Sequence, residues 1–127
     1  PTVSFAGQVT DEQLRQVYRE ARALLFCGVE DFGIVPVEAI SCGCPVIAFA
    51  EGGALETVRI GAEPKGVLFA ERSVSSVFQA IEHLNALWGE GAFEPKSMHS
   101  YAQGFSADAF RHAIRSEINE TVGESSA

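Results

Sequence analysis

Short apolar segments alternate with helix-like segments along most of this chain, and this alternation constrains its fold more than any other feature. Three of the apolar segments are continuous, which is typical of strands covered on both faces of a parallel sheet. They are Leu24–Cys27, Pro45–Ala50 and Gly66–Phe69. Thr2–Phe5 alternates polar and apolar residues, consistent with a further short strand. The sequence therefore predicts an α/β fold, a Rossmann-like parallel sheet of about four strands with helices on both faces.

The intervening segments carry helix start and stop signals. Thr10 and Gln13 have the spacing of a capping box, and an apolar stripe at helical spacing follows them, from Leu14 to Ala21. Pro36 suits the first position of a short helix, and Gly43 suits the position just after its end. These signals place helices between the predicted strands, as βα units require.

The second half of the chain is predicted to be mainly helical. Apolar residues follow helical spacing from Val74 to Trp88, and we interpret this stripe, Phe78 included, as a core face. Ser106 is a candidate N-cap for a last helix. The apolar face of that helix shows Phe110, Ile114 and Ile118. We expect residues 1–122 to belong to one domain and residues 123–127 to form a frayed tail.

Composition excludes several classes of function. The chain has 127 residues, enough for one domain or a piece of one, and its 46% apolar residues can supply a core. The net charge of −8 argues against a nucleic-acid or anionic-membrane partner, because either would need a concentrated basic surface. A phosphate ligand remains compatible with this charge, because a helix N-terminus can bind phosphate without basic side chains.

The three cysteines, Cys27, Cys42 and Cys44, form neither a disulfide framework nor a zinc-binding pattern. We interpret them as reduced and mostly buried, which favours a cytoplasmic setting. No secretory signal or membrane-spanning apolar run is present, and the start at Pro1 suggests an excised fragment. The histidines, His83, His99 and His112, have no ligand partner at metal spacing and are predicted to be surface residues.

Glycines and carboxylates concentrate after two predicted strands, where ligands bind in sheets of this type. In the first stretch, Gly33 permits close approach of a ligand, and the free N–H groups at the following helix start, near Ile34 and Val35, suit a diphosphate. Glu30 and Glu38 could hold the hydroxyl groups of a sugar and a ribose. Two plainer interpretations stay open: Glu38 as an acid in the first helical turn, where the helix dipole favours it, and Glu30 as a solvated loop residue.

Gly52-Gly53 with Glu56 is the second stretch. Two glycines permit a tight turn and a close approach to a sugar. A plain strand-to-helix turn followed by a first-turn acid is the alternative interpretation.

Read in register, Glu30 to Ala39, Gly43 to Ala48 and Gly52 to Glu56 resemble the family-4 retaining glycosyltransferases of GT-B fold. The resemblance extends over roughly residues 2 to 118, and implies the C-terminal part of the nucleotide-sugar-binding domain. The Glu-x7-Glu spacing of Glu30 and Glu38 is part of the family pattern. The subgroup that the first stretch most resembles is the bacterial mannosyltransferases.

The resemblance implies a role for each matching residue. Glu30 matches the motif glutamate that contacts the donor hexose near the reacting centre, and Glu38 matches the glutamate that binds the ribose. The residues that match the segment around the donor sugar and diphosphate are Phe32, Gly33, Ile34, Val35 and, in the Gly-Gly turn, Gly53.

The donor implied is a GDP- or UDP-linked hexose, without a metal or other cofactor. The acceptor, a sugar or lipid-linked glycan, is expected to bind through an absent N-terminal domain. Cys27 departs from the family, which often has proline there, and the family's Arg and Lys for the diphosphate normally lie upstream of Thr2. We therefore expect this chain alone to be inactive. A non-catalytic nucleotide-sugar-binding or interaction module remains the alternative, and a response-regulator-like domain is disfavoured because the first strand lacks a clustered acidic pocket.

Overall fold

The computed structural model describes residues 2–125 and contains a three-stranded parallel sheet. Its strands are β1 (Leu24–Phe26), β2 (Val46–Phe49) and β3 (Gly66–Phe69), in the order β1-β2-β3. The register pairs Leu24 with Val46 and Val46 with Gly66. The three continuous apolar segments predicted to be strands are thus confirmed.

Thr2–Phe5 forms no strand, so the expectation of a fourth strand was wrong. Within residues 2–125 this segment pairs with no other, and the side chains of Val3 and Phe5 are 70% and 95% exposed. Alternation can give a segment an apolar face, but a strand forms only where a neighbour accepts its hydrogen bonds. β1 lies at an edge of the three-stranded sheet of residues 2–125, and Leu25 is 50% exposed. The prediction that β1 is covered on both faces was therefore wrong.

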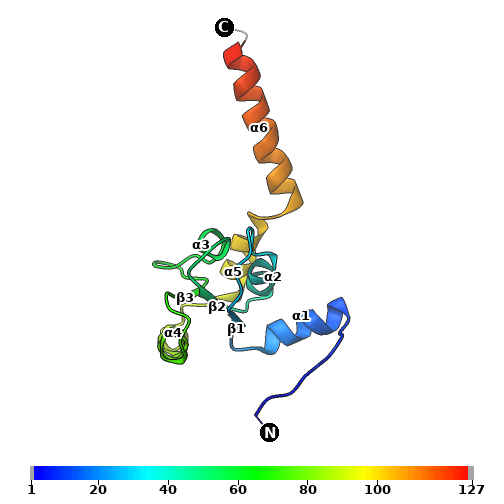
Figure 1. Ribbon diagram of the computed structural model, residues 1–127. Coiled ribbons are helices and arrows are strands. Elements are labelled where there is room, and N and C mark those ends of the chain that lie inside the picture. The colour runs from blue at the N-terminus through cyan, green and yellow to red at the C-terminus, as the bar shows by residue number, and fades with distance from the viewer. Residues whose placement is uncertain (1, 126–127) are drawn as a thin grey trace.

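Helices cover both faces of the sheet, as predicted. On one face, α4 (Val74–Gly89) packs against β2 and β3. On the other, α2 (Ile34–Ser41) packs against β1 and β2 and is itself covered by α5 (Pro95–Gln103). The short helix α3 (Ala54–Thr57) contacts α2. Figure 1 shows the strands between α4 on one side and α2 with α5 on the other.

Two predicted helix starts are confirmed in atomic detail. Before α1 (Asp11–Glu20), the Thr10 hydroxyl accepts from the Gln13 N–H at 3.2 Å, and the Gln13 side chain accepts from the Thr10 N–H at 2.9 Å. Before α6 (Ala107–Ser125), the Ser106 hydroxyl accepts from the Ala109 N–H at 3.1 Å. In both helices the cap satisfies a backbone donor that has no partner inside the helix.

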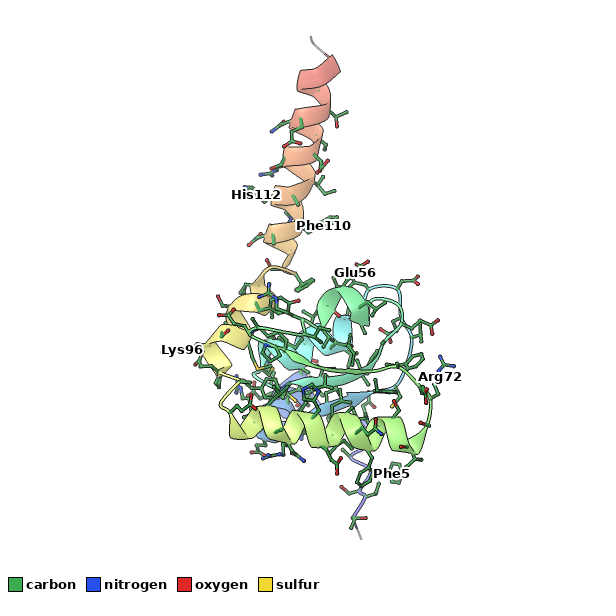
Figure 2. The ribbon with its side chains drawn as sticks, turned by 90° about the vertical axis from the view of Figure 1, so that its left-hand side faces the viewer. Phe5, Glu56, Arg72, Lys96, Phe110 and His112 are labelled. Carbon is green, nitrogen blue, oxygen red and sulfur yellow. The ribbon has the colours of Figure 1, made fainter. Side chains whose placement is uncertain are left out.

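Helix α6 runs away from the sheet, as Figure 1 and the labelled Phe110 and His112 in Figure 2 show. Its apolar face is open to solvent, with Phe110 66%, Ile114 43% and Ile118 55% exposed. The helix continues through residues 123–125, residues 126–127 lie outside the described residues, and fraying of the tail stays a prediction.

The core is centred on β2, all four residues of which are buried. Ile40 of α2, Leu84 of α4 and Met98 of α5 pack around it. Phe78 is 62% exposed, so its interpretation as a core residue was wrong. The face of α4 that is buried carries Ala80 and Leu84, and successive helical residues are rotated by about 100°, which turns Phe78 away from that face.

The cysteines are all free but differ in environment: Cys44 is buried, Cys42 is partly buried and Cys27 is exposed. The expectation of burial was therefore wrong for Cys27, which follows the edge strand β1 where the chain leaves the sheet. Burial raises the pKa of the Cys44 thiol to about 11, because the thiolate would lose its hydration.

We expect this difference to appear in alkylation by iodoacetamide at pH 8. The thiolate is the reactive form, so a rise in pKa from 9.0 to about 11 leaves Cys44 with about 100-fold less of it. Mass spectrometry should find Cys27 modified first, and Cys44 modified only after addition of denaturant. Equal rates for Cys27 and Cys44 in the native protein would contradict the burial of Cys44.

Candidate functional site

Two segments follow the carboxyl ends of neighbouring strands: the β1–α2 loop (residues 27–33) and the Gly-Gly turn (residues 50–53) between β2 and α3. They contact each other directly, since the Gly53 N–H donates to the Glu30 carbonyl oxygen at 2.6 Å. The sequence predicted that both segments would lie at the same edge of the sheet, and this placement is confirmed.

The glycines of the turn make this contact sterically feasible. A Cβ on Gly53 would lie 2.3 Å from the Phe32 carbonyl carbon and 2.7 Å from the Asp31 carbonyl oxygen. A Cβ on Gly52 would lie 2.6 Å from the Glu30 carbonyl oxygen. The space left by the missing side chains is thus filled by the β1–α2 loop itself. This packing supports the plainer interpretation of the turn, and contact between Gly53 and a donor stays a prediction.

Gly33 ends the loop and sets the direction of α2. Its φ of +80° is left-handed, a conformation that favours glycine, and a Cβ there would lie 3.2 Å from Thr57 Oγ1. Because the helix begins directly after this turn, Ile34 is its first residue, and Pro36 occupies the third position and not the predicted first. Proline fits there because the N–H groups of the first turn need no partner within the helix.

The N-terminus of α2 offers donors to a ligand. The N-cap residue is Gly33, which has no side chain to accept hydrogen bonds from the first N–H groups of the helix. The N–H groups of Ile34 and Val35 belong to the turn whose donors have no acceptor inside an α-helix. They point outward with the positive end of the helix dipole, an arrangement that suits an anion.

Glu38 lies in the second turn of α2, and the first turn of this helix contains no acid. Its expected position in the first turn was wrong, because the helix starts two residues earlier than Pro36 suggested. The dipole interpretation of Glu38 therefore loses its basis, since that effect is confined to the first turn. Glu38 is exposed and lines a pocket of about 300 Å³ with Arg15 and Tyr18 of α1. Burial, and then the nearby Glu38 carboxylate, raise the pKa of the Tyr18 hydroxyl.

The structure does not bring every candidate residue to one point. Glu30, Phe32, Gly33 and Gly53 belong to the contact between loop and turn, whereas Glu38 faces α1 further along α2. Phe32 is 49% exposed, and Ile34 is 58% exposed, so both present apolar surface beside the carboxylates. Glu56 is exposed on α3, and Figure 2 shows it above the strands.

Three residues that support the site were missed in the sequence. The Thr57 hydroxyl donates to the Gly53 carbonyl oxygen at 3.0 Å, and the Tyr101 hydroxyl donates to the Thr57 carbonyl oxygen at 2.9 Å. Phe105 meets Phe32 edge-on, with ring centroids 6.1 Å apart. All three lie outside the glycine- and carboxylate-rich stretches, so no local pattern pointed to them.

Three basic side chains, Arg22, Arg59 and Lys65, make contacts outside the loop and the turn. Arg22 donates to Asn85 at 2.8 Å, and Arg59 lies over the Tyr101 ring at 4.7 Å from its centroid. Lys65 is 2% exposed and lies just before β3, at the end of the sheet opposite the site. Its ammonium group donates to the Ser97 hydroxyl of α5. Its burial lowers the pKa of the ammonium group.

No helix within residues 2–125 combines the length and apolar character needed to cross a membrane. In the same part of the chain, no three or more His, Cys, Asp or Glu side chains are grouped so that they could hold a metal ion. His83, His99 and His112 are all exposed, which confirms their prediction as surface residues.

Residues 1–103 match the family described as glycosyl transferases group 1. A D-inositol 3-phosphate glycosyltransferase of Mycobacteroides abscessus is 31% identical over 123 residues, which are 96% of this chain and 27% of that protein. An uncharacterized glycosyltransferase of Methanocaldococcus jannaschii is 30% identical over 88 residues, 68% of this chain and 22% of that protein.

Among solved structures, a sucrose-phosphate synthase from Thermosynechococcus elongatus superimposes with a TM-score of 0.71 and 26% sequence identity. The superposition covers 95% of this chain and 30% of the synthase. This chain spans about a quarter of the length of the two curated relatives above, 27% of the first and 22% of the second. The shared parallel sheet with helices on both faces is part of a GT-B fold. The chain belongs to the glycosyl transferases group 1 family, of GT-B type.

Proposed function

We propose that this chain forms the donor side of the active site of a family-4 retaining hexosyltransferase. The complete protein would transfer a hexose, of the mannose or glucose type, from a GDP- or UDP-linked donor. The observation that carries this proposal is the hydrogen bond from the Gly53 N–H to the Glu30 carbonyl oxygen. It joins the two glycine- and carboxylate-rich segments into one surface, beside an α2 N-terminus whose N-cap residue, Gly33, makes no side-chain hydrogen bond to the helix.

Each part of this surface has a chemistry that suits one part of a nucleotide sugar. The free N–H groups of Ile34 and Val35 would donate to the diphosphate. Glu38, further along α2, would accept hydrogen bonds from two ribose hydroxyls, and Glu30 would do the same for the hexose near the reacting carbon. In this proposal Phe32, Gly33 and Gly53 shape the surface around the sugar.

The leaving diphosphate gains negative charge during transfer, and donors already directed at it lower the barrier. The α2 N-terminus supplies part of this stabilisation, and basic side chains from outside this chain would supply the rest. We propose that transfer needs no metal and retains the configuration of the hexose. The acceptor, a sugar or lipid-linked glycan, would bind on a further domain of the complete protein.

Glu38→Ala tests this proposal. It should weaken binding of GDP-mannose or UDP-glucose about 30-fold, because hydrogen bonds to a charged group are worth about 2 kcal/mol. Titration calorimetry measures the affinity, and NMR of the wild-type chain should show shifts centred on residues 33–38.

The matched control is Glu82→Ala, which removes an exposed carboxylate on α4 at the opposite face of the sheet. We expect wild-type affinity for Glu82→Ala and an unchanged melting temperature for both variants. Equal affinity in the two variants, or NMR shifts confined to other residues, would refute the donor site. A chain that binds donor, in a full-length protein that transfers no hexose, would instead favour a non-catalytic nucleotide-sugar-binding module.

A further inference from the structure

The β1–α2 loop is held at two points on either side of Asp31. At the first, the Glu30 carbonyl oxygen accepts the Gly53 N–H at 2.6 Å. At the second, the Phe32 ring meets the Phe105 ring edge-on, at a centroid distance of 6.1 Å and an angle of 74°. Aromatic pairs prefer this geometry, because the positive edge of one ring faces the negative face of the other. Two fixed points this close together restrict the directions open to the Glu30 and Phe32 side chains.

Phe105 also contacts a second ring, that of Tyr101. Its ring meets Tyr101 edge-on at 5.5 Å and 68°. The Tyr101 hydroxyl donates to the Thr57 carbonyl oxygen at 2.9 Å, and the Thr57 hydroxyl donates to the Gly53 carbonyl oxygen at 3.0 Å. The contacts thus form a closed path from the loop through α5 and α3 to the Gly-Gly turn, and each member orients the next.

The position of the Phe32–Phe105 contact separates it from the core. Phe32 is 49% exposed, Phe105 is partly buried, and neither belongs to the buried core. Burial of apolar area is therefore a small part of what this pair contributes, since that contribution scales with the area removed from water. Its edge-on geometry instead fixes where the loop residue Phe32 lies.

We propose that Phe105 is a positioning residue for the donor hexose. It acts through Phe32, which it holds so that the loop presents Glu30 to the sugar in one arrangement. This inference rests on the proposed function of the loop. In this inference the loop held by Phe105 binds the sugar end of the donor. Glu38 on α2 binds the nucleotide end, and Glu38 is not part of the path of contacts described above.

The test compares this chain with three variants. Phe105→Leu removes the ring, Phe105→Tyr keeps it, and Phe110→Leu removes a ring that is 66% exposed on α6. Calorimetry measures the affinities for UDP and GDP and for UDP-glucose and GDP-mannose. Hydrogen exchange of the unliganded chain at the Gly53 amide, which donates to the Glu30 carbonyl oxygen, measures opening of the loop away from the turn.

For Phe105→Leu we expect the affinity for UDP-glucose or GDP-mannose to fall about fivefold, as loss of the Phe32–Phe105 ring contact implies. The affinity for UDP or GDP alone should not change. The Gly53 amide should exchange about fivefold faster while β2 amides exchange as before. Phe105→Tyr should restore wild-type behaviour, and Phe110→Leu should not differ from wild type.

Two results would overturn the positioning role. One is unchanged exchange of the Gly53 amide in Phe105→Leu. The other is an equal loss of affinity for diphosphate and sugar nucleotide, together with faster exchange in β2. A wild-type chain that binds none of the four compounds would overturn the proposed function and, with it, any role for Phe105 toward a hexose. The exchange rates would then report separately on whether Phe105 holds the loop.

Discussion

Replacement of Gly53 with alanine should weaken donor binding about tenfold or more and lower the free energy of unfolding by about 2 kcal/mol. The added Cβ would lie 2.3 Å from the carbonyl carbon and 2.4 Å from the carbonyl oxygen of Phe32. Both are backbone atoms, which cannot swing aside as a flexible side chain can. The β1–α2 loop must therefore move, and Glu30 would lose its hydrogen bond from the Gly53 N–H.

Backbone strain does not contribute to this effect, because Gly53 has a φ of −61° and a ψ of −22°, which alanine adopts readily. Gly89→Ala is the matched control: its Cβ meets no atom within 4 Å, and it lies in the last turn of α4. That variant should be as stable as wild type or about 0.5 kcal/mol more stable. Urea denaturation and donor calorimetry measure the two effects. Wild-type stability and affinity in Gly53→Ala would show that the loop does not pack against the turn.

Gly66→Ala should destabilise the fold more than any other substitution considered, by about 3 kcal/mol or more. Gly66 opens β3 directly opposite Val46 of β2. A Cβ there would lie 2.0 Å from the Val46 carbonyl oxygen and 2.9 Å from the Val58 side chain. Pairing of β2 with β3 would have to shift at its first residue, in the most buried part of the sheet.

Gly28→Ala is the control for Gly66→Ala, because Gly28 also adjoins a strand, and its Cβ would make only an ordinary 3.7 Å contact with Phe26. Urea denaturation followed by circular dichroism should place the midpoint of Gly66→Ala far below that of Gly28→Ala, which should lie close to wild type. Similar midpoints for the two variants would contradict the close approach of β3 to β2.

Local chemistry predicted much of the secondary structure. Thr10 with Gln13 and Ser106 mark helix starts because each cap bonds only to residues three positions away. The run Pro45–Ala50 predicted a buried strand because a fully apolar segment is stable only where both its faces are covered. Features that depend on neighbours close in sequence can be read from the sequence.

Partners distant in sequence decided the remainder. Thr2–Phe5 has the alternation of a strand but no strand beside it within residues 2–125, so it stays unpaired. Phe78 follows helical spacing, yet the sheet lies on another side of α4. The helix start at Ile34 depends on the left-handed turn at Gly33, which packs against Thr57. In each case the sequence pattern predicted a strand, a buried face or a helix start, and contacts with distant segments determined whether that structure formed.

The same division applies to the candidate site. The sequence by itself determined which chemical groups the candidate site can offer, because Glu30, Glu38 and the glycines are read directly from it. It also placed two glycine-rich segments at one edge of a parallel sheet. Only the tertiary structure decided that Gly53 serves the packing of loop against turn, and that Phe105 meets Phe32. The physical reason is that residue type fixes which hydrogen bonds and ring contacts a side chain can form. Which of them form depends on segments far apart in the chain that folding brings together.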